Sequence, residues 1–270
     1  MSFTGQTAWI TGASSGIGAA LARELAGRGA AVILSGRDEA RLRSVAEGLP
    51  GDTLVLPFEV TDEAAMQAAT ERATAWRGVD LFFANAGISQ RSRAVETAMA
   101  VYRRIIDVDL TAQIAATQAL LPHLAGRGSG TLVFISSIAG KVGVPLRTAY
   151  CAAKHGLIGY ADALRAELSQ SGVLVHVVCP GSVATDVSRN ALTGSGQTRG
   201  RSDKAIDEGL APDEAARAIL DGIAAGEREI VVARGAEQAM GEMRRTPDAL
   251  FDQMAAMVAT GYMEAVTGED

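Results

Sequence analysis

Tyr150 and Lys154 stand four residues apart in an alanine-rich run with a helical pattern. Side chains at this spacing rise from one face of a helix, so the phenol and the ammonium can meet. A phenol is a weak acid near neutral pH, and a positive charge held beside it stabilises the phenolate. The pair therefore predicts proton transfer by Tyr150 with Lys154 as its electrostatic partner.

Ser137 follows the apolar run 131–136, which we expect to form a buried strand. Its hydroxyl would then lie at the carboxyl end of a strand, where open α/β sheets bind their ligands. Taken alone, such a serine is usually a turn residue, and Tyr and Lys at this spacing are commonly a surface pair. A nucleotide-binding unit in the same chain would favour the catalytic interpretation of all three.

A glycine-rich turn, Gly12-Ala-Ser-Ser-Gly16-Ile-Gly18, joins an expected strand at 7–11 to a helical run that ends near residue 29. Such a turn lets a phosphate approach backbone N–H groups at the positive end of the helix, where a Cβ would block it. The spacing differs from the commoner G-x-G-x-x-G fingerprint, although the mechanism is shared. A glycine cluster alone can be a tight turn, but the strand and helix around it favour nucleotide binding. The expected cofactor contacts are Gly12, Ser14, Ser15, Gly16, Ile17 and Gly18.

The second expected strand, 31–35, ends at Gly36-Arg37. In nucleotide-binding units of this type an acidic residue at this point binds the adenosine ribose of NAD, whereas an arginine accommodates the 2′-phosphate of NADP. Gly36 removes the acid and Arg37 supplies the cation, which can hold a phosphate through two parallel hydrogen bonds. NADP(H) is therefore preferred, with NAD(H) possible. The alternative is that Arg37 is an ordinary loop cation beside Asp38.

Composition narrows the class of protein. Of the 270 residues 48% are hydrophobic and only 4% aromatic, so the core must be aliphatic, as in strands covered by helices on both faces. A net charge of −6 argues against nucleic acid as a partner. The N-terminus has no signal-peptide pattern and no window is apolar enough to span a membrane, so we expect a soluble cytoplasmic protein.

The cysteines and histidines indicate neither disulfides nor a metal site. Cys151 and Cys179 have no paired spacing, and His123, His155 and His176 are scattered along the chain. A disulfide framework and a zinc site are therefore not expected, and ordinary surface or core roles suit the histidines.

Strand and helix patterns alternate from one end of the chain to the other without a linker. Further strands are expected at 53–59, 80–84, 131–136, 174–178 and 229–232, and further helices at 38–49, 62–77, 99–124, 148–171 and from 212. This alternation predicts a single domain over 1–270, a Rossmann-like, doubly wound sheet of seven parallel strands with helices on both faces.

Two segments stand outside this alternation. The polar segment 186–210 is long and rich in small residues, as in a mobile loop over a binding site. The stretch 247–263 reads as an amphipathic helix. We expect it to pack on its own domain or on a sister subunit, because its polar face carries no Lys or Arg for a membrane surface.

Taken together, the motifs resemble those of the short-chain dehydrogenase/reductase family. The shared pieces are T-G-A-S-S-G-I-G at 11–18, Asn85-Ala86-Gly87, Ser137, Tyr150-x3-Lys154 and Pro180-Gly181 followed by Thr185. They occur in the family's order and spacing and cover most of the chain. I-S-S-I-A-G-K, A-Y-C-A-A-K-H and S-R-N-A-L-T are similar to the branch that contains members 7 and 7B. The N-terminal membrane anchor of some members is not expected here.

The resemblance implies a two-part site. The diphosphate would lie on the glycine-rich turn, and the nicotinamide would lie near the residues that follow the sixth strand. Tyr150 would give its proton to a carbonyl oxygen, Ser137 would hydrogen-bond the same oxygen, and Lys154 would hold the ribose hydroxyls. The further cofactor contacts implied are Glu59, Val60, Asn85, Ala86, Gly87, Tyr150, Lys154, Pro180, Gly181, Val183 and Thr185. From its type alone, Asn85 could equally tie neighbouring strand ends together.

Two residues depart from the family's pattern. Asp109 stands where members commonly have an asparagine that helps to hold a proton-relaying water, and it brings a negative charge near Lys154. We count it among the catalytic candidates and expect a working relay with altered pH dependence. Glu59 replaces the usual aspartate beside the adenine, and its longer side chain could move that contact.

The leading interpretation is an NADP(H)-dependent reductase or dehydrogenase for the carbonyl or secondary alcohol of a medium-sized, fairly apolar compound. One alternative is a non-catalytic NADP(H)-binding sensor or scaffold. Another is a 3-oxoacyl-carrier-protein reductase, which would need a basic docking patch with Arg91, Arg93, Arg103 and Arg104 as candidates. The resemblance also implies a homotetramer or homodimer assembled through the two long helices.

Overall fold

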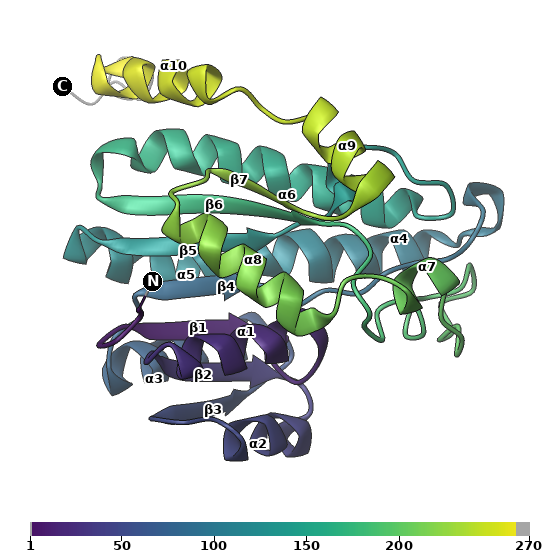
Figure 1. Cartoon of the computed structure of the whole chain (residues 1–270), viewed down its shortest axis with the longest axis horizontal. Helices are drawn as coiled ribbons and strands as arrows, with labels where there is room; N and C mark the ends of the chain where they lie inside the picture. The colour runs from purple at the N-terminus through teal and green to yellow at the C-terminus, as the bar shows by residue number, and fades with distance from the viewer. Residues whose placement is uncertain (1, 263–270) are drawn as a thin grey trace.

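A single seven-stranded parallel sheet organises the computed structural model, which describes residues 2–262 (Figure 1). The strand order is β3-β2-β1-β4-β5-β6-β7, which confirms the predicted doubly wound class. β1 pairs with both β2 and β4, so the winding reverses direction between β1 and β4. The strands are β1 Thr7–Thr11, β2 Ala31–Gly36, β3 Thr53–Pro57, β4 Leu81–Ala84, β5 Gly130–Ile135, β6 Val173–Pro180 and β7 Glu229–Val232.

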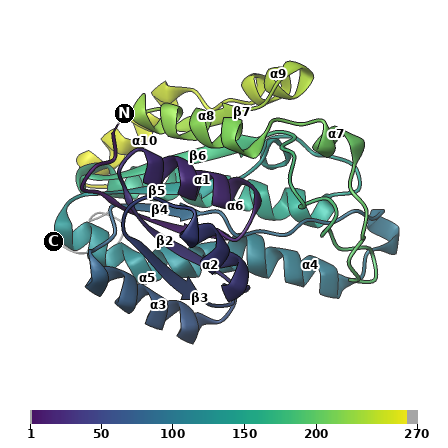
Figure 2. The same cartoon turned by 60° about the horizontal axis from the view of Figure 1, so that its bottom comes forward.

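Helices cover both faces of the sheet (Figures 1 and 2). One apolar cluster joins the sheet to α1, α2 and α8, for example through Leu21 and Ile219. The other joins it to α3, α5 and α6, for example through Ala116 and Ala161. Because both faces are covered, every residue of β1, β2 and β4 is buried. The helices are α1 Gly16–Gly27, α2 Glu39–Glu47, α3 Glu63–Trp76, α4 Met99–Ile106, α5 Ala112–Arg127, α6 Thr148–Glu167, α7 Lys204–Asp207, α8 Pro212–Ala224, α9 Gly235–Met243 and α10 Asp248–Ala259.

Local sequence explains where several helices begin. The carboxylates of Asp38 and Asp62 accept hydrogen bonds from backbone N–H groups in the first turns of α2 and α3. Pro212 occupies the first position of α8, where its missing N–H costs no helical hydrogen bond. The two capping aspartates lie two and five residues after the last residues of β2 and β3, so α2 and α3 begin close to the carboxyl ends of these strands.

The expected helix at 99–124 is interrupted. Between α4 and α5 the segment Asp107–Thr111 forms a π-helical turn, and α5 continues to Arg127. The amide of Gln113 donates to the carbonyl oxygens of Ala86 and Val108, at 2.7 and 2.9 Å, and so fixes this wide turn against the loop after β4. Single wide turns inside helices occur frequently at functional sites, and this one contains Asp109.

The C-terminal part of the described chain contains two helices. We did not anticipate α9, which lies between β7 and the last helix. The expected helix at 247–263 forms as α10, and residue 263 of that range lies outside the described residues. Phe251 of α10 is buried, and the guanidinium of Arg165 from α6 stacks over its ring at 4.3 Å. The helix therefore packs on its own chain.

Two further properties concern the described residues 2–262. None of their helices is long and apolar enough to cross a membrane. Cys151 and Cys179 are buried free thiols.

Candidate active site

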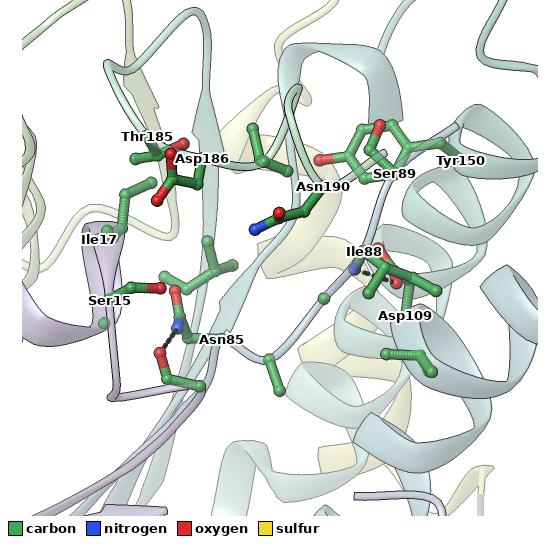
Figure 3. Close-up of a pocket in the computed structure, with 18 of the residues that line it drawn as sticks. Ser15, Ile17, Asn85, Ile88, Ser89, Asp109, Tyr150, Thr185, Asp186 and Asn190 are labelled. Carbon is green, nitrogen blue, oxygen red and sulfur yellow. Dashed lines mark hydrogen bonds between the residues drawn. The ribbon is translucent and has the colours of Figure 1, made fainter. Parts of the chain in front are cut away.

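A cleft of about 610 Å³ opens at the carboxyl ends of the strands, where the winding of the sheet reverses (Figure 3). Every residue named above as a catalytic or cofactor-binding candidate lines this cleft. The fold thus brings together residues from the ends of β1 to β6 and from three helices. Their joint placement is a result of the topology, because parallel strands all present their carboxyl ends at one edge.

The glycine-rich turn leaves no room for side chains. A Cβ on Gly18 would lie 2.3 Å from the carbonyl oxygen of Gly12, and one on Gly12 would lie 2.9 Å from the side-chain amide nitrogen of Asn85. Gly12 also has a φ of 66°, which favours glycine. α1 begins at Gly16 without a side-chain cap from Ser15. A bare backbone at an uncapped helix N-terminus fits the diphosphate of a dinucleotide.

Asn85 ties two strand ends together. Its side-chain amide donates to the carbonyl oxygens of Thr11 and Gly12, at 2.8 and 3.3 Å, and Figure 3 draws one of these bonds as a dashed line from Asn85. The hydroxyl of Thr11 accepts the backbone N–H groups of Asn85 and Ala86 in return. Asn85 therefore has the structural role that its residue type allows, and it also forms part of the cleft wall.

Two arginines share one carboxylate at the end of the cleft beside β2 and β3. Glu59 lies 3.6 Å from Arg37 and 3.5 Å from Arg104, measured between the nearest nitrogen and Oε2. The longer glutamate side chain thus reaches cations from both the second strand and α4. Two guanidiniums against one carboxylate leave positive charge at this end, which suits an anionic group on the ribose.

Lys154 is buried and points at the end of β5. Its ammonium donates to the carbonyl oxygen of Ile135 at 3.0 Å and lies 5.6 Å from the centre of the Tyr150 ring. The Tyr150 ring directs its hydroxyl into the cleft (Figure 3). Ser137 also lines the cleft. Two hydrogen bonds hold its hydroxyl, which accepts from the N–H of Ala139 at 3.1 Å and donates to the Pro180 carbonyl at 3.4 Å.

Asp109 sits behind Lys154. One carboxylate oxygen accepts the backbone N–H of Ile88 at 2.8 Å, and the other lies 3.4 Å from the Lys154 ammonium. Among the described residues this second oxygen has no hydrogen-bond partner, and Asp109 is completely buried. Burial raises the pKa of Asp109 to about 6, although the Lys154 ammonium opposes the shift.

Glu237 is a contributor that sequence reasoning missed. Its carboxylate accepts the backbone N–H and the hydroxyl of Ser182, at 2.7 and 2.8 Å, and so holds the loop that follows β6. A Cβ on Gly181 would lie 2.4 Å from the same carboxylate. The residue comes from α9, and the only local signal was the glycine it packs against.

The polar segment 186–210 is tied to the loop after β4. Leu192 exchanges backbone hydrogen bonds with Ser89 and Arg91, at 2.8 and 2.9 Å. Asp203, just before α7, forms an ion pair with Arg91 at 2.6 Å. The segment thereby forms part of the cleft wall, and Figure 3 shows the side-chain amide of Asn190 directed away from Tyr150, toward the side of the cleft where Ser15 and Asn85 lie.

The family model described as short chain dehydrogenase matches residues 6–195. The chain is 37% identical to dehydrogenase/reductase SDR family member 7B of Danio rerio over 234 residues, which is 83% of this chain and 76% of that protein.

Solved structures agree with this match. Levodione reductase superposes with a TM-score of 0.78 at 25% identity, covering 88% of this chain and 99% of its own. A short-chain dehydrogenase from Sphingobium yanoikuyae in complex with NADPH superposes with a TM-score of 0.75 at 25% identity, covering 98% and 96%.

Proposed function

The chain belongs to the short-chain dehydrogenase family, and from that premise we propose that it is an NADP(H)-dependent oxidoreductase acting on the carbonyl or secondary alcohol of a medium-sized compound. Its similarity to member 7B confirms the branch that the motifs indicated. The observation that carries the proposal is the convergence of Ser137, Tyr150 and buried Lys154 on the cleft that contains the bare glycine-rich turn.

When bound, a nicotinamide cofactor supplies the hydride for carbonyl reduction or accepts it in alcohol oxidation. The glycine-rich turn from Gly12 to Gly18 would hold the diphosphate, and the loop from Pro180 to Thr185 would hold the nicotinamide. Glu237 fixes that loop through Ser182. The side chains that act on the substrate are those of Ser137, Tyr150 and Lys154.

Tyr150 donates its phenolic proton to the carbonyl oxygen as that oxygen gains negative charge. The hydroxyl of Ser137 hydrogen-bonds the same oxygen, which stabilises the developing charge. Lys154 lies close enough to the Tyr150 ring to stabilise the phenolate that remains. In the oxidative direction Tyr150 accepts the proton of the alcohol.

The preference for NADP(H) rests on Arg37. The side chain is 66% exposed and turns toward the cleft, held by a 3.6 Å ion pair to Glu59. Arg104 pairs with the same carboxylate, so a 2′-phosphate would meet two guanidiniums and one carboxylate.

The substrate would lie between the Tyr150 wall and the segment 186–210. Apolar side chains line that part of the cleft: Ile88, Val187, Leu192 and Ile206. They suit a largely apolar carbon skeleton. The segment would act as the loop that covers the bound substrate.

The function is tested by mixing the purified protein with NADPH or NADH and a panel of ketones, aldehydes and diketones, and following cofactor absorbance. We expect turnover with NADPH, a loss of at least about a thousandfold in kcat for Tyr150→Phe, and a loss of no more than about tenfold in the NADPH affinity of that variant. Tight NADPH binding without turnover of any carbonyl would favour the sensor or scaffold alternative.

The carrier-protein alternative receives little support from the arginines that were its candidates. Arg91 lies inside the cleft in an ion pair with Asp203, and Arg104 pairs with Glu59 at the opposite end. Arg93 and Arg103 are exposed. The four side chains therefore do not form one docking patch.

We also propose a homo-oligomer assembled through α5 and α6, as the family resemblance implies. α10 already covers part of α6, with Phe251 stacked against Arg165. Sedimentation equilibrium of the full chain tests this assembly, and a monomer at micromolar concentration would contradict it.

A further inference from the structure

Three guanidinium groups converge on one carboxylate beside the substrate half of the cleft, and two of them, those of Arg91 and Arg147, line it. Asp203 Oδ2 lies 2.6 Å from Arg91 Nε and 3.7 Å from Arg147 Nη2, and its other oxygen accepts from Arg199. The four residues come from the loop after β4, the start of α6 and the segment 186–210. They meet only because the fold places that segment over the strand ends.

This cluster carries more positive than negative charge. Three guanidiniums against one carboxylate leave a formal excess of two positive charges. The other carboxylates lining the same half of the cleft are already matched, since Asp186 pairs with Arg189 at 3.5 Å and Asp109 with Lys154 at 3.4 Å. Arg91 is almost completely buried at 7% side-chain exposure, so water does little to offset the excess. Burial and the Arg147 guanidinium both lower the pKa of Arg91, as expected among like charges.

The three arginines differ in the hydrogen bonds that they make with Asp203 and its neighbours. Arg91 donates to Asp203, to the Ser89 hydroxyl and to the Gln90 carbonyl, and Arg199 donates to Asp203 and the Ser188 hydroxyl. These bonds hold the segment 186–210 in place.

Arg147 is different. Among residues 2–262 its guanidinium has only the 3.7 Å contact with Asp203 and makes no hydrogen bond, yet it is three-quarters buried and lines the cleft. The N–H groups of the Arg147 guanidinium are therefore available to bind a ligand in the cleft.

The backbone before Arg147 is held in an uncommon conformation. Leu146 has a φ of 66°, and it is the one non-glycine residue with a positive φ in the described part of the chain. Its carbonyl accepts the N–H of Ser92 at 3.1 Å, which fixes the turn. A residue keeps an uncommon backbone conformation only where the surrounding structure holds it. Here that conformation leads the chain into Arg147 at the N-terminus of α6.

We propose that Arg147, with Arg91 behind it, binds the carboxylate of the substrate, which is accordingly an oxo acid in the reductive direction and a hydroxy acid in the oxidative one. Arg147 occupies the N-cap position of the helix that carries Tyr150 about one turn later, so the carboxylate would lie a few carbon atoms from the reacting carbonyl. Ser89, which accepts from Arg91 at 2.9 Å, lines the same cleft as Tyr150. The apolar lining then contacts the rest of the skeleton. This inference rests on the proposed oxidoreductase function.

Matched substrates test it directly. Oxo acids with six to ten carbon atoms are compared with their methyl esters, with NADPH as the reductant. Because a bidentate arginine–carboxylate contact is among the stronger hydrogen-bonded pairs, we expect the acid to be preferred about 10- to 100-fold in kcat/KM. Arg147→Gln should bring the acid-to-ester ratio close to one, and Arg147→Lys should restore part of the preference. Arg93→Gln removes the same charge from an exposed position outside the cleft lining and should leave the ratio unchanged.

A binding measurement separates the failure of this inference from the failure of the proposed function. Hexanoate should raise the Tm of the wild type more than hexanamide does, and Arg147→Gln should abolish the difference. If the protein reduces neutral ketones and kcat/KM is equal for an oxo acid and its methyl ester, the carboxylate subsite is wrong but the oxidoreductase function is not. Equal effects of hexanoate and hexanamide would overturn it even if no carbonyl were reduced.

Discussion

The carboxylate of Asp109 lies 3.4 Å from the ammonium of Lys154, and both side chains are buried. The lysine that would stabilise the Tyr150 phenolate is thus itself paired with an anion. Where many members of the family place a neutral amide, this chain places a group whose charge depends on pH. The consequence is a site whose electrostatics change near pH 6.

Replacing Asp109 by Asn should change the pH dependence of catalysis. Above about pH 6 ionised Asp109 offsets the positive charge of Lys154, whereas the amide does not. A stronger net positive charge beside Tyr150 favours its phenolate, so the high-pH limb of carbonyl reduction should move to lower pH by about half a unit to one unit. The measurement is the pH–rate profile of kcat/KM for both proteins. A profile that coincides with that of the wild type would contradict this role.

The same carboxyl should make the stability of the protein depend on pH. Its folded-state pKa of about 6 lies above the ordinary value of 3.8, so the folded state binds more protons than the unfolded state between these values. Ionisation of Asp109 therefore lowers stability as pH rises through this window, by about 3 kcal/mol at most.

Urea unfolding at several pH values checks this expectation. Relative to Asp109→Asn, the wild type should lose stability between pH 4 and pH 7. Asp107→Asn changes an exposed carboxyl in the same π-helical turn and should follow the wild type. Parallel curves for wild type and Asp109→Asn would show that the buried carboxyl does not titrate in this range.

Arg37 should determine the choice of cofactor. For Arg37→Ala we expect kcat/KM with NADPH to fall about 10- to 100-fold and that with NADH to change by less than about threefold, because only the 2′-phosphate loses its partner. Arg43→Ala is the matched control, since Arg43 is exposed on α2 and pairs with Glu39 away from the cleft. A wild type that works much better with NADH would refute the assignment.

Gly18 and Gly27 lie on the same helix and should respond oppositely to alanine. At Gly18 the added Cβ would meet the Gly12 carbonyl oxygen at 2.3 Å, so Gly18→Ala should destabilise the fold by about 2 kcal/mol or more and abolish cofactor binding. At Gly27 no atom lies within 4 Å, and Gly27→Ala should stabilise α1 by about 0.5–1 kcal/mol. Thermal unfolding and NADPH titration compare the two, and a tolerated Gly18→Ala would show that the turn can open.

Local spacing in the sequence determined most of the fold. Alternating apolar strands and amphipathic helices predicted the seven-stranded doubly wound sheet, and the glycine-rich turn and the Tyr150–Lys154 spacing depend on residues that are neighbours along the chain. Backbone sterics and the helical repeat act over a few residues, so elements and motifs of this kind can be predicted from the sequence without a structure. The helix α9 was missed because it is a run of only nine residues in which Gly241 alone is buried, so its role is defined by contacts such as that of Glu237 with Ser182.

Only the tertiary structure decided which charges face one another. The π-helical turn sets Asp109 behind Lys154, α9 brings Glu237 to Ser182, and the segment 186–210 carries Asp203 to Arg91 and Arg147. Each of these contacts joins residues far apart in sequence, and each depends on burial as well as distance. Electrostatic interactions strengthen as water is excluded, so the proton chemistry and the charge of the substrate half of the cleft emerge only once the chain has packed.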